Sequence, residues 1–216
     1  MCLDDGAMTL RVLAVADEVA DALYGDTLEQ LKPDVIVGCG DLPFEYLENL
    51  VSRFNGPLLY VPGNHDAALR PPDPDWVGLS GEGAGVGAAG CVNVDGRIEA
   101  AAGLRIAGLG GSIRYRPGPN QYTQRQMRFR ALRLEIQARL MRRPVDVLIS
   151  HSPPAGHGDA DDPAHIGFSA YLRLIATLAP KVMFHGHVRH YGPKAADRRI
   201  GTTLIVNAIP YRLIEV

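Results

Sequence analysis

Acid, amide and imidazole side chains recur along the chain, each directly after a short apolar run. They are Asp17, Gly40-Asp41, Gly63-Asn64-His65-Asp66, His151 and His185-Gly186-His187. Because a parallel sheet presents side chains at the carboxyl ends of its strands, we expect these groups to meet at one edge of a sheet. Aspartate, asparagine and histidine together suit a divalent metal ion that handles phosphate. The sequence therefore predicts a metal site that acts on a phosphate compound.

The apolar runs define the strands that must position these groups. We expect strands over residues 10–16, 34–38, 57–61, 145–150 and 181–184. Helices are expected between them, over residues 20–31, 43–54, 121–143 and 168–178, with Gly25 as a weak point in the first and Pro43 in the first turn of the second. A β-α-β-α-β order at the start predicts parallel strands with right-handed crossovers.

The remaining segments follow different patterns. Residues 67–90 are rich in proline and glycine and predict a long loop, in which Trp76 would serve as a lid or an anchor. Short strands over residues 91–94, 97–101 and 104–109 are expected to be antiparallel, and residues 202–206 and 211–216 to form a closing hairpin. The apolar side of the 121–143 helix is assigned to Met127, Leu132, Leu134, Ile136 and Leu140.

Bulk properties limit the classes of protein. A length of 216 residues suits one domain over residues 1–216, with residues 1–8 as an expected disordered N-terminus. No apolar run reaches the roughly 18 residues of a membrane span, so no membrane partner is expected. An acidic start and three widely spaced cysteines favour a reducing cytoplasm. Seven arginines on the 121–143 helix leave nucleic acid open as a partner without favouring it.

Taken in order, the motifs resemble those of the calcineurin-like metallophosphoesterase family, in which D-x-H, G-D, G-N-H-D/E, a lone histidine and G-H-x-H each follow a strand. The matches are Asp17, Gly40-Asp41, Gly63-Asn64-His65-Asp66, His151 and Gly186-His187, within roughly residues 10–216. The resemblance implies an α/β fold, a two-sheet β-sandwich flanked by helices. It also implies two divalent ions that clamp a phosphate and activate a water molecule.

The resemblance assigns roles to the matched residues. Asp41 would bridge the two ions, and the second metal site would be completed by Asn64, His151 and His187. The neutral amide of Asn64 adds no repulsion against an anionic substrate, so it is also a candidate substrate contact.

Two catalytic residues and one further contact come from the same resemblance. His65 would contact the phosphate and protonate the leaving oxygen, while Asp66 orients its ring. His165 lies in a segment that resembles one bordering the active site in bacterial relatives, which makes it a candidate substrate contact. The alternative for His165 is a plain exposed acidic loop.

The other metal site departs from the family pattern. That site should combine Asp17 and Asp41 with two histidines, but Val19 and Arg189 stand at the histidine positions. In one explanation a single ion is tightly held, and the Arg189 guanidinium replaces the lost charge by binding substrate or pairing with Asp17. In another, a second ion is held weakly by Asp17, Asp41 and water, assisted by Glu18, Asp21 or His190. In the third, the protein is a catalytically inactive scaffold.

These observations predict a metal-dependent phosphoesterase that hydrolyses a small phosphate monoester or diester. The expected cofactor is a divalent ion, Mn²⁺ in first place with Fe, Zn or Mg as alternatives, one tightly bound and a second weak or absent. A non-catalytic phosphate-binding or scaffold protein on the same fold is the alternative. The intact His65 and Asp66 favour the enzyme, because a scaffold does not need a general acid. Oligomeric state is not defined by the sequence.

Overall fold

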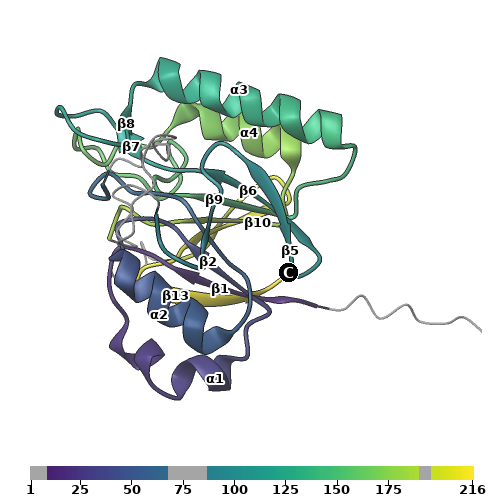
Figure 1. Ribbon diagram of the computed structural model, residues 1–216. Coiled ribbons are helices and arrows are strands. Elements are labelled where there is room, and N and C mark those ends of the chain that lie inside the picture. Colours follow the sequence, from purple (N-terminus) through teal and green to yellow (C-terminus); the bar gives the residue numbers. More distant parts are fainter. Residues whose placement is uncertain (1–8, 68–86, 190–195) are drawn as a thin grey trace, which may run out of the picture.

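Two β-sheets pack face to face, and helices cover the outer face of each (Figure 1). The computed structural model describes residues 9–67, 87–189 and 196–216, and every structural statement below concerns these ranges. The expected two-sheet sandwich flanked by helices is therefore confirmed. The Trp76 and His190 assignments, and most of the expected 67–90 loop, lie outside the described residues.

The first sheet has the strand order β13-β1-β2-β3-β4. Its strands are β1 (Arg11–Val15), β2 (Val35–Gly38), β3 (Leu58–Tyr60), β4 (Val92–Asn93) and β13 (Tyr211–Glu215). Strands β1, β2 and β3 are parallel neighbours, as the β-α-β-α-β order predicts. Their outer face is covered by a 3₁₀ helix η1 (Asp21–Tyr24), helix α1 (Thr27–Leu31) and helix α2 (Phe44–Phe54).

The second sheet has the order β11-β12-β10-β9-β6-β5. Its strands are β5 (Ile98–Ala101), β6 (Leu104–Leu109), β9 (Val147–Ser150), β10 (Val182–His185), β11 (Arg198–Ile200) and β12 (Thr203–Asn207). Helices α3 (Gln124–Met141) and α4 (Ser169–Leu178) cover its outer face. A small separate pair joins β7 (Ser112–Ile113) to β8 (Gln121–Tyr122).

Both faces of each central strand are buried, which explains the uninterrupted apolar runs of the sequence. Along β1, Val12 and Ala14 point into the core between the two sheets, whereas Leu13 and Val15 point toward α1 and α2. Successive side chains of a strand alternate between faces, so a strand buried on both sides must be apolar throughout. Four layers result, in the order helix, sheet, sheet, helix.

Helix boundaries follow local signals in the sequence. Helix α3 begins with a capping box in which the Thr123 hydroxyl accepts from the backbone N–H of Gln126 and the Gln126 side chain accepts from the N–H of Thr123. It starts later than expected because Gln121 and Tyr122 belong to β8. The expected 20–31 helix is divided into η1 and α1, since Gly25 takes an extended conformation between them.

Two expected strand pairings are wrong. Strand β4 is parallel to β3 and joins the first sheet, while only β5 and β6 form the expected antiparallel pair. The expected closing hairpin does not form either, because β12 pairs with β10 and β11 in the second sheet and β13 pairs with β1 in the first. In both cases the strand pairs with a strand that is distant in sequence, at a sheet edge whose backbone groups would otherwise be unpaired. The local sequence carries little information about which edge a strand will join.

The apolar face expected for the 121–143 helix is also partly wrong. Met127 and Leu134 are fully buried, but Leu132, Ile136 and Leu140 are exposed by 39, 47 and 77%. The small residues Ala131 and Ala138 complete the buried face instead, because α4 approaches closely there. Among the described residues, no helix combines the length and apolar character that a membrane crossing requires.

Candidate metal centre

Five loops bring the sequence motifs together at one end of the sandwich. Asp17, Asp41 and Asn64 follow β1, β2 and β3 of the first sheet, and His151 and His187 follow β9 and β10 of the second. A pocket of about 440 Å³ lies there and is lined by Asp17, Asp41, Asn64, His65, Tyr115, Ala164, His165, His187 and Arg189. The carboxyl ends of parallel strands from both sheets therefore build a single site.

Three of the candidate ligands have a backbone conformation that side-chain-bearing residues rarely adopt. The φ angles of Asp17, Asp41 and His187 are +58°, +55° and +68°. Such left-handed conformations cost about 1–3 kcal/mol each and collect at functional sites. Hydrogen bonds hold them in place, since Asp17 Oδ2 accepts from the backbone N–H of His187 at 2.9 Å and Asp66 Oδ2 accepts from that of Asp41 at 3.0 Å.

Two glycines are required because carboxylates pack directly against their Cα atoms. A Cβ atom on Gly63 would lie 2.0 Å from Asp41 Oδ1, and one on Gly186 would lie 2.1 Å from Asp17 Oδ2. Contacts this short do not occur between real atoms, so any side chain at either position would displace the acid. This explains the Gly in G-N-H-D and in G-H-V-R by sterics alone.

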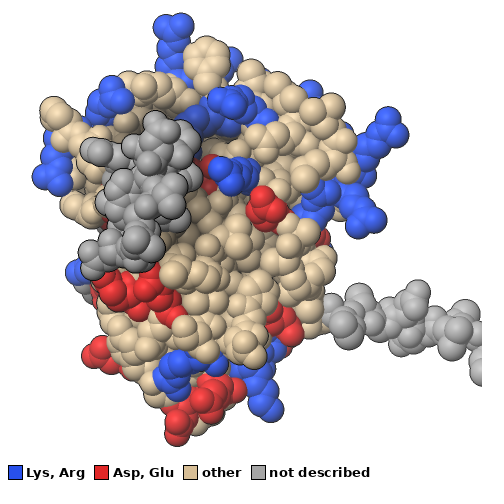
Figure 2. Space-filling model, in the orientation of Figure 1, with Lys and Arg blue, Asp and Glu red and all other residues tan. Residues whose placement is uncertain are grey.

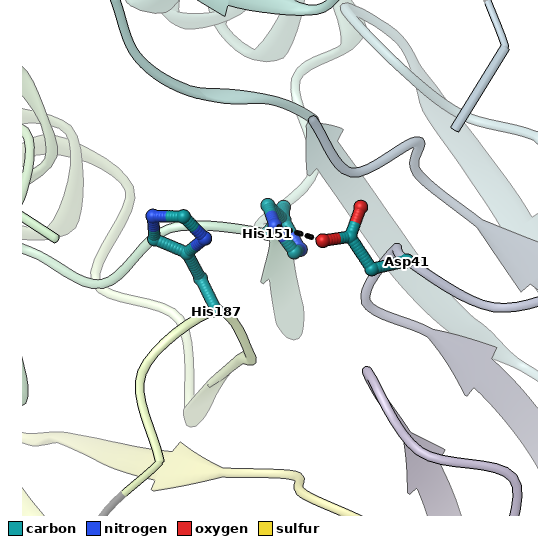
Figure 3. A group of neighbouring side chains, drawn as sticks. All are labelled: Asp41, His151 and His187. Carbon is teal, nitrogen blue, oxygen red and sulfur yellow. Dashed lines mark ion pairs between the residues drawn. The ribbon is translucent and has the colours of Figure 1, made fainter. Parts of the chain in front are cut away.

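Asp41, His151 and His187 form a cluster that could hold a metal ion (Figure 3). One potential ligand atom from each lies within 4.8 Å of the others. The His151 Nε2 atom is 3.3 Å from Asp41 Oδ2, and it is also 3.0 Å from Asn64 Oδ1. These atoms come from loops of both sheets; Asp41, Asn64 and His187 line the pocket, and His151 is fully buried.

The donor set of this cluster fits a cation. The other ring nitrogen of His151, Nδ1, lies 2.8 Å from the backbone carbonyl of Cys39, and because a carbonyl only accepts, this nitrogen must carry a proton. In the neutral ring, Nε2 then carries a lone pair. This lone pair faces two other acceptors, the carboxylate of Asp41 and the amide oxygen of Asn64. Three acceptors facing one another repel unless a positive charge lies between them, and either a proton on Nε2 or a metal ion can supply it.

His187 and Asn64 add to the fit. The His187 Nε2–H donates to the backbone carbonyl of Ala164 at 2.8 Å, which leaves the lone pair on Nδ1. The Nδ2 atom of Asn64 is buried and has no hydrogen-bond partner among the described residues. A buried donor without a partner costs roughly 1–3 kcal/mol, so this amide is suited to a ligand that accepts a hydrogen bond.

The pKa values of His151, Asp41 and His187 reflect how strongly their surroundings favour a positive charge at the cluster. Burial acts to lower the pKa of His151, but the hydrogen bond and charge of Asp41 outweigh it and raise this pKa to about 9. Burial likewise acts to raise the pKa of Asp41, and His151 reverses the direction so that this pKa is lowered. Burial and then the charge of His151 lower the pKa of His187 to about 3, so its imidazole is neutral at pH 7.

Asp17 lies beside this cluster, and neighbouring charges and hydrogen bonds offset the burial of its carboxylate only in part. Burial raises the pKa of Asp17 to about 6, against the opposing charge of His151 and the hydrogen bond from His187. Among the effects on this pKa, the charge of Arg189 is the weakest. The Arg189 side chain instead pairs with Glu18, with Nε 2.8 Å from Oε1, and both side chains are partly exposed. Val19 is 39% exposed and does not line the pocket.

The last two residues of the G-N-H-D turn, His65 and Asp66, have different surroundings. The imidazole of His65 is exposed and lines the pocket, while its backbone N–H donates to Asp41 Oδ1 at 2.8 Å. The hydrogen bonds of Asp66 Oδ2 go to the backbone N–H groups of Asp41 and Gly63, at 3.0 and 2.7 Å. These two bonds join the loop after β2 to the loop after β3.

Further residues border the pocket on the outer side. His165 lines it with its ring centroid 5.0 Å from that of His187, and its Nδ1 is bonded to the Asp162 carboxylate at 2.8 Å. Tyr115 also lines the pocket, and Asn120 Nδ2 holds the turn by donating to the Gly63 carbonyl at 2.9 Å. The sequence offered no signal for these last two, because both lie in an irregular segment.

His185, the first histidine of its motif, takes no part in the lining. It is 1% exposed and its Nδ1 lies 3.1 Å from the carbonyl of Gly186. Residues two apart on a continuous strand share a face, but β10 ends at His185 and His187 has a φ angle of +68°, so the two side chains take different directions. The structure therefore places His187 in the pocket and His185 in the packed interior.

Solved structures of other proteins share the fold of this chain. One crystal structure superposes with a TM-score of 0.65 at 18% identity, covering 96% of this chain and 95% of that one. The crystal structure of TT1561 of Thermus thermophilus gives a TM-score of 0.63 at 19% identity, with coverage of 93% and 89%. A comparison with curated proteins found no match. The family model for calcineurin-like phosphoesterases matches residues 10–191, and the chain belongs to this family.

Proposed function

We propose that this protein hydrolyses a phosphate monoester or diester with the help of one tightly bound divalent cation. The observation that supports this best is the meeting of the Asp41 carboxylate, the Asn64 amide oxygen and the His151 Nε2 atom, an arrangement that requires either a proton or a metal cation between them. Membership of the calcineurin-like phosphoesterase family supports the same reaction class.

The cation would be held by Asp41, Asn64, His151 and His187. Mixed oxygen and nitrogen ligands suit manganese, with iron, zinc and magnesium as alternatives. When bound, the cation supplies Lewis acidity and lowers the pKa of an adjacent water molecule. Cys39 offers no thiolate to the cation, since it presents its carbonyl to His151 and its buried side chain packs in the core between the sheets.

The chain's own residues bind the phosphate and handle the proton. Asn64 Nδ2, a buried donor without a partner, is suited to donate to a phosphate oxygen. The exposed imidazole of His65 lies in the same pocket and can deliver a proton to the leaving oxygen. Arg189 can bind a further phosphate oxygen by exchanging its partner Glu18 for substrate, and His165 borders the substrate's path.

The second metal position is proposed to be weak or absent. Asp17 keeps a carboxylate in the pocket, but one of its oxygens already accepts from the His187 backbone. The Arg189 guanidinium pairs with Glu18 and makes no ion pair with Asp17 among the described residues. Arg189 is therefore proposed to act on the substrate, which supports the explanation with one tightly held ion.

Metal analysis and turnover test this function together. The purified protein is expected to hold about one equivalent of transition metal and to hydrolyse bis-p-nitrophenyl or p-nitrophenyl phosphate when manganese is supplied. His65→Ala should lower turnover by about 10²- to 10⁴-fold with unchanged metal content. His157→Ala is the matched control, because His157 does not line the pocket. Bound metal without any activity on either ester would favour the scaffold alternative.

A further inference from the structure

Helix α3 has two apolar faces. The inner face packs on the sheet and on α4 through Met127, Ala131, Leu134 and Ala138. The other consists of Phe129, Leu132, Ile136 and Leu140, which are exposed by 57, 39, 47 and 77%. Their spacing of three and four residues places them in one line along the helix, opposite the inner face. We call this line the outer apolar stripe.

The outer apolar stripe is unusual for a helix that covers a sheet. Such a helix normally presents polar residues to water on the face opposite the core. Here the stripe continues into a groove of about 820 Å³ between α3 and α4, in which Phe129, Leu132 and Ala170 supply apolar surface. An exposed apolar surface of this kind indicates a site that binds a protein, a membrane or a ligand.

Arginines flank the stripe along its whole length, as the blue side chains over α3 illustrate (Figure 2). They are Arg125, Arg128, Arg133, Arg139, Arg142 and Arg143. The one acid of the helix, Glu135, is 1% exposed and is bonded by both its oxygens to Arg173. Within the described part of α3, no exposed acid is therefore present to neutralise these arginines.

This charge pattern distinguishes between the possible binding partners of the outer apolar stripe. A second copy related by two-fold symmetry would place the same surface against itself, and arginines would then face arginines. A nucleic acid would satisfy the arginines but leave Phe129 and Leu140 against phosphates. An anionic bilayer satisfies both features, because apolar side chains enter the acyl boundary while flanking arginines contact lipid phosphates.

We propose that the outer apolar stripe and its arginines bind the protein to the surface of an anionic lipid bilayer, with α3 lying parallel to the membrane plane. Phe129, Ile136 and Leu140 would enter the boundary of headgroups and acyl chains. Arginine is suited to this role because its guanidinium binds phosphate oxygens through two hydrogen bonds and its stem packs on apolar surface.

The charge at the other end of the molecule favours the same orientation. Exposed acids gather around η1, α1 and α2, at the end opposite α3 (Figure 2), namely Asp21, Asp26, Glu29 and Glu45. An anionic surface repels this end and attracts the α3 end. None of the residues that line the metal pocket belongs to α3, so the proposal does not depend on the proposed catalytic function.

This inference revises the expectation of no membrane partner. That expectation rested on the lack of an apolar run long enough to span a bilayer. A surface-bound helix needs only one apolar face, and sequence periodicity had assigned Leu132, Ile136 and Leu140 to the core.

Vesicle cosedimentation with the whole chain tests the proposal. The probes are vesicles of phosphatidylcholine alone and vesicles in which about one third is phosphatidylserine. Binding is expected only to the anionic vesicles, and it should weaken by about tenfold or more between low and physiological salt. The double variant Phe129→Ser/Leu140→Ser and the triple variant Arg133→Gln/Arg139→Gln/Arg143→Gln should each weaken binding by about tenfold or more.

Matched controls change exposed residues of the same types outside α3. Val92→Ser, at a position 46% exposed on β4, and Arg199→Gln on β11 should bind vesicles like the unchanged protein. Thermal unfolding midpoints equal to that of the unchanged protein establish that the variants fold. The proposal is overturned if the folded protein ignores anionic vesicles at low salt, or if the Phe129→Ser/Leu140→Ser variant binds them equally well. Dimers that Leu140→Ser dissociates, or duplex DNA binding without vesicle binding, would likewise overturn it.

Discussion

At the scale of single residues, the site is built from backbone conformations that are unfavourable on their own. Asp17, Asp41 and His187 are all left-handed, at about 1–3 kcal/mol each. Side-chain oxygens of Asp17 and Asp66 accept hydrogen bonds from His187 and Asp41 and compensate part of this cost. The acids at positions 17 and 66 thus shape the loops that carry the ligands, whatever else they bind.

A methyl group at Gly63 should impair metal binding without unfolding the protein. In Gly63→Ala the new Cβ would lie 2.0 Å from Asp41 Oδ1, so Asp41 must move away from His151. Metal affinity, measured by isothermal titration calorimetry with Mn²⁺, is expected to fall by about tenfold or more. Gly25→Ala is the control, because its Cβ would meet no atom closer than 3.7 Å. Unchanged affinity in Gly63→Ala would show that Asp41 is not a ligand.

Restoring imidazoles at positions 19 and 189 should strengthen the second metal position. In Val19→His/Arg189→His, two neutral nitrogens would join the Asp17 carboxylate, whose burial is poorly compensated at present. Metal content measured by elemental analysis is expected to rise from about one equivalent toward two. Arg199→His provides the comparison for an added surface histidine. A content that stays at one equivalent would contradict the proposed correspondence of these positions with the family's ligands.

At the scale of elements, helix α3 shows the limit of periodicity as a predictor. Residues three and four apart share a face, but α3 has apolar residues on two opposite faces. Both stripes fit the helical period, and the positions of the second sheet and of α4 determine which one is buried. The strands were predicted well because both their faces are apolar, whereas their long-range partners in β4 and β13 were not.

Two neighbouring leucines on α3 allow a direct test of this orientation. Leu134 is fully buried, so Leu134→Ala is expected to lower the free energy of unfolding by about 2–5 kcal/mol. Leu132 is 39% exposed, and Leu132→Ala should change it by about 1 kcal/mol or less. Urea unfolding followed by circular dichroism measures both variants. Equal losses, or a larger loss for Leu132, would mean that the helix is rotated about its axis.

At the scale of the whole molecule, the candidate metal centre joins the two sheets. Asp41 and Asn64 follow strands of the first sheet, and His151 and His187 follow strands of the second. A cation held by all four would be lost on unfolding, since the unfolded chain does not bring them together. Metal binding is therefore coupled to the packing of one sheet on the other.

Removing metal should destabilise the protein as a whole. After treatment with a chelator the thermal unfolding midpoint is expected to fall, and Mn²⁺ at about 100 times its Kd should restore about 2.7 kcal/mol of stability. His151→Ala, which removes a buried ligand, should abolish the response to Mn²⁺. If the unchanged protein unfolds at the same temperature with and without Mn²⁺, the cation does not bind across the sheets.

The order of the motifs was sufficient to predict the family, the two-sheet fold and the pairing of site residues with strand ends. It was insufficient wherever a role depends on contacts between distant loops. The bond from Asp66 to the Asp41 backbone, the clamp from Asn120 to Gly63 and the Arg189–Glu18 pair are examples. Each joins segments whose mutual approach is set by tertiary packing, and none leaves a pattern in local sequence.

The pairing of β13 with β1 has a consequence for the order of events during synthesis. These strands lie about two hundred residues apart in sequence but are adjacent in the first sheet, with Arg11 opposite Glu215. While the chain is being translated, the outer edge of β1 stays without its partner until residues 211–215 have left the ribosome. For that period β1 offers an unpaired apolar edge to which another extended strand can add.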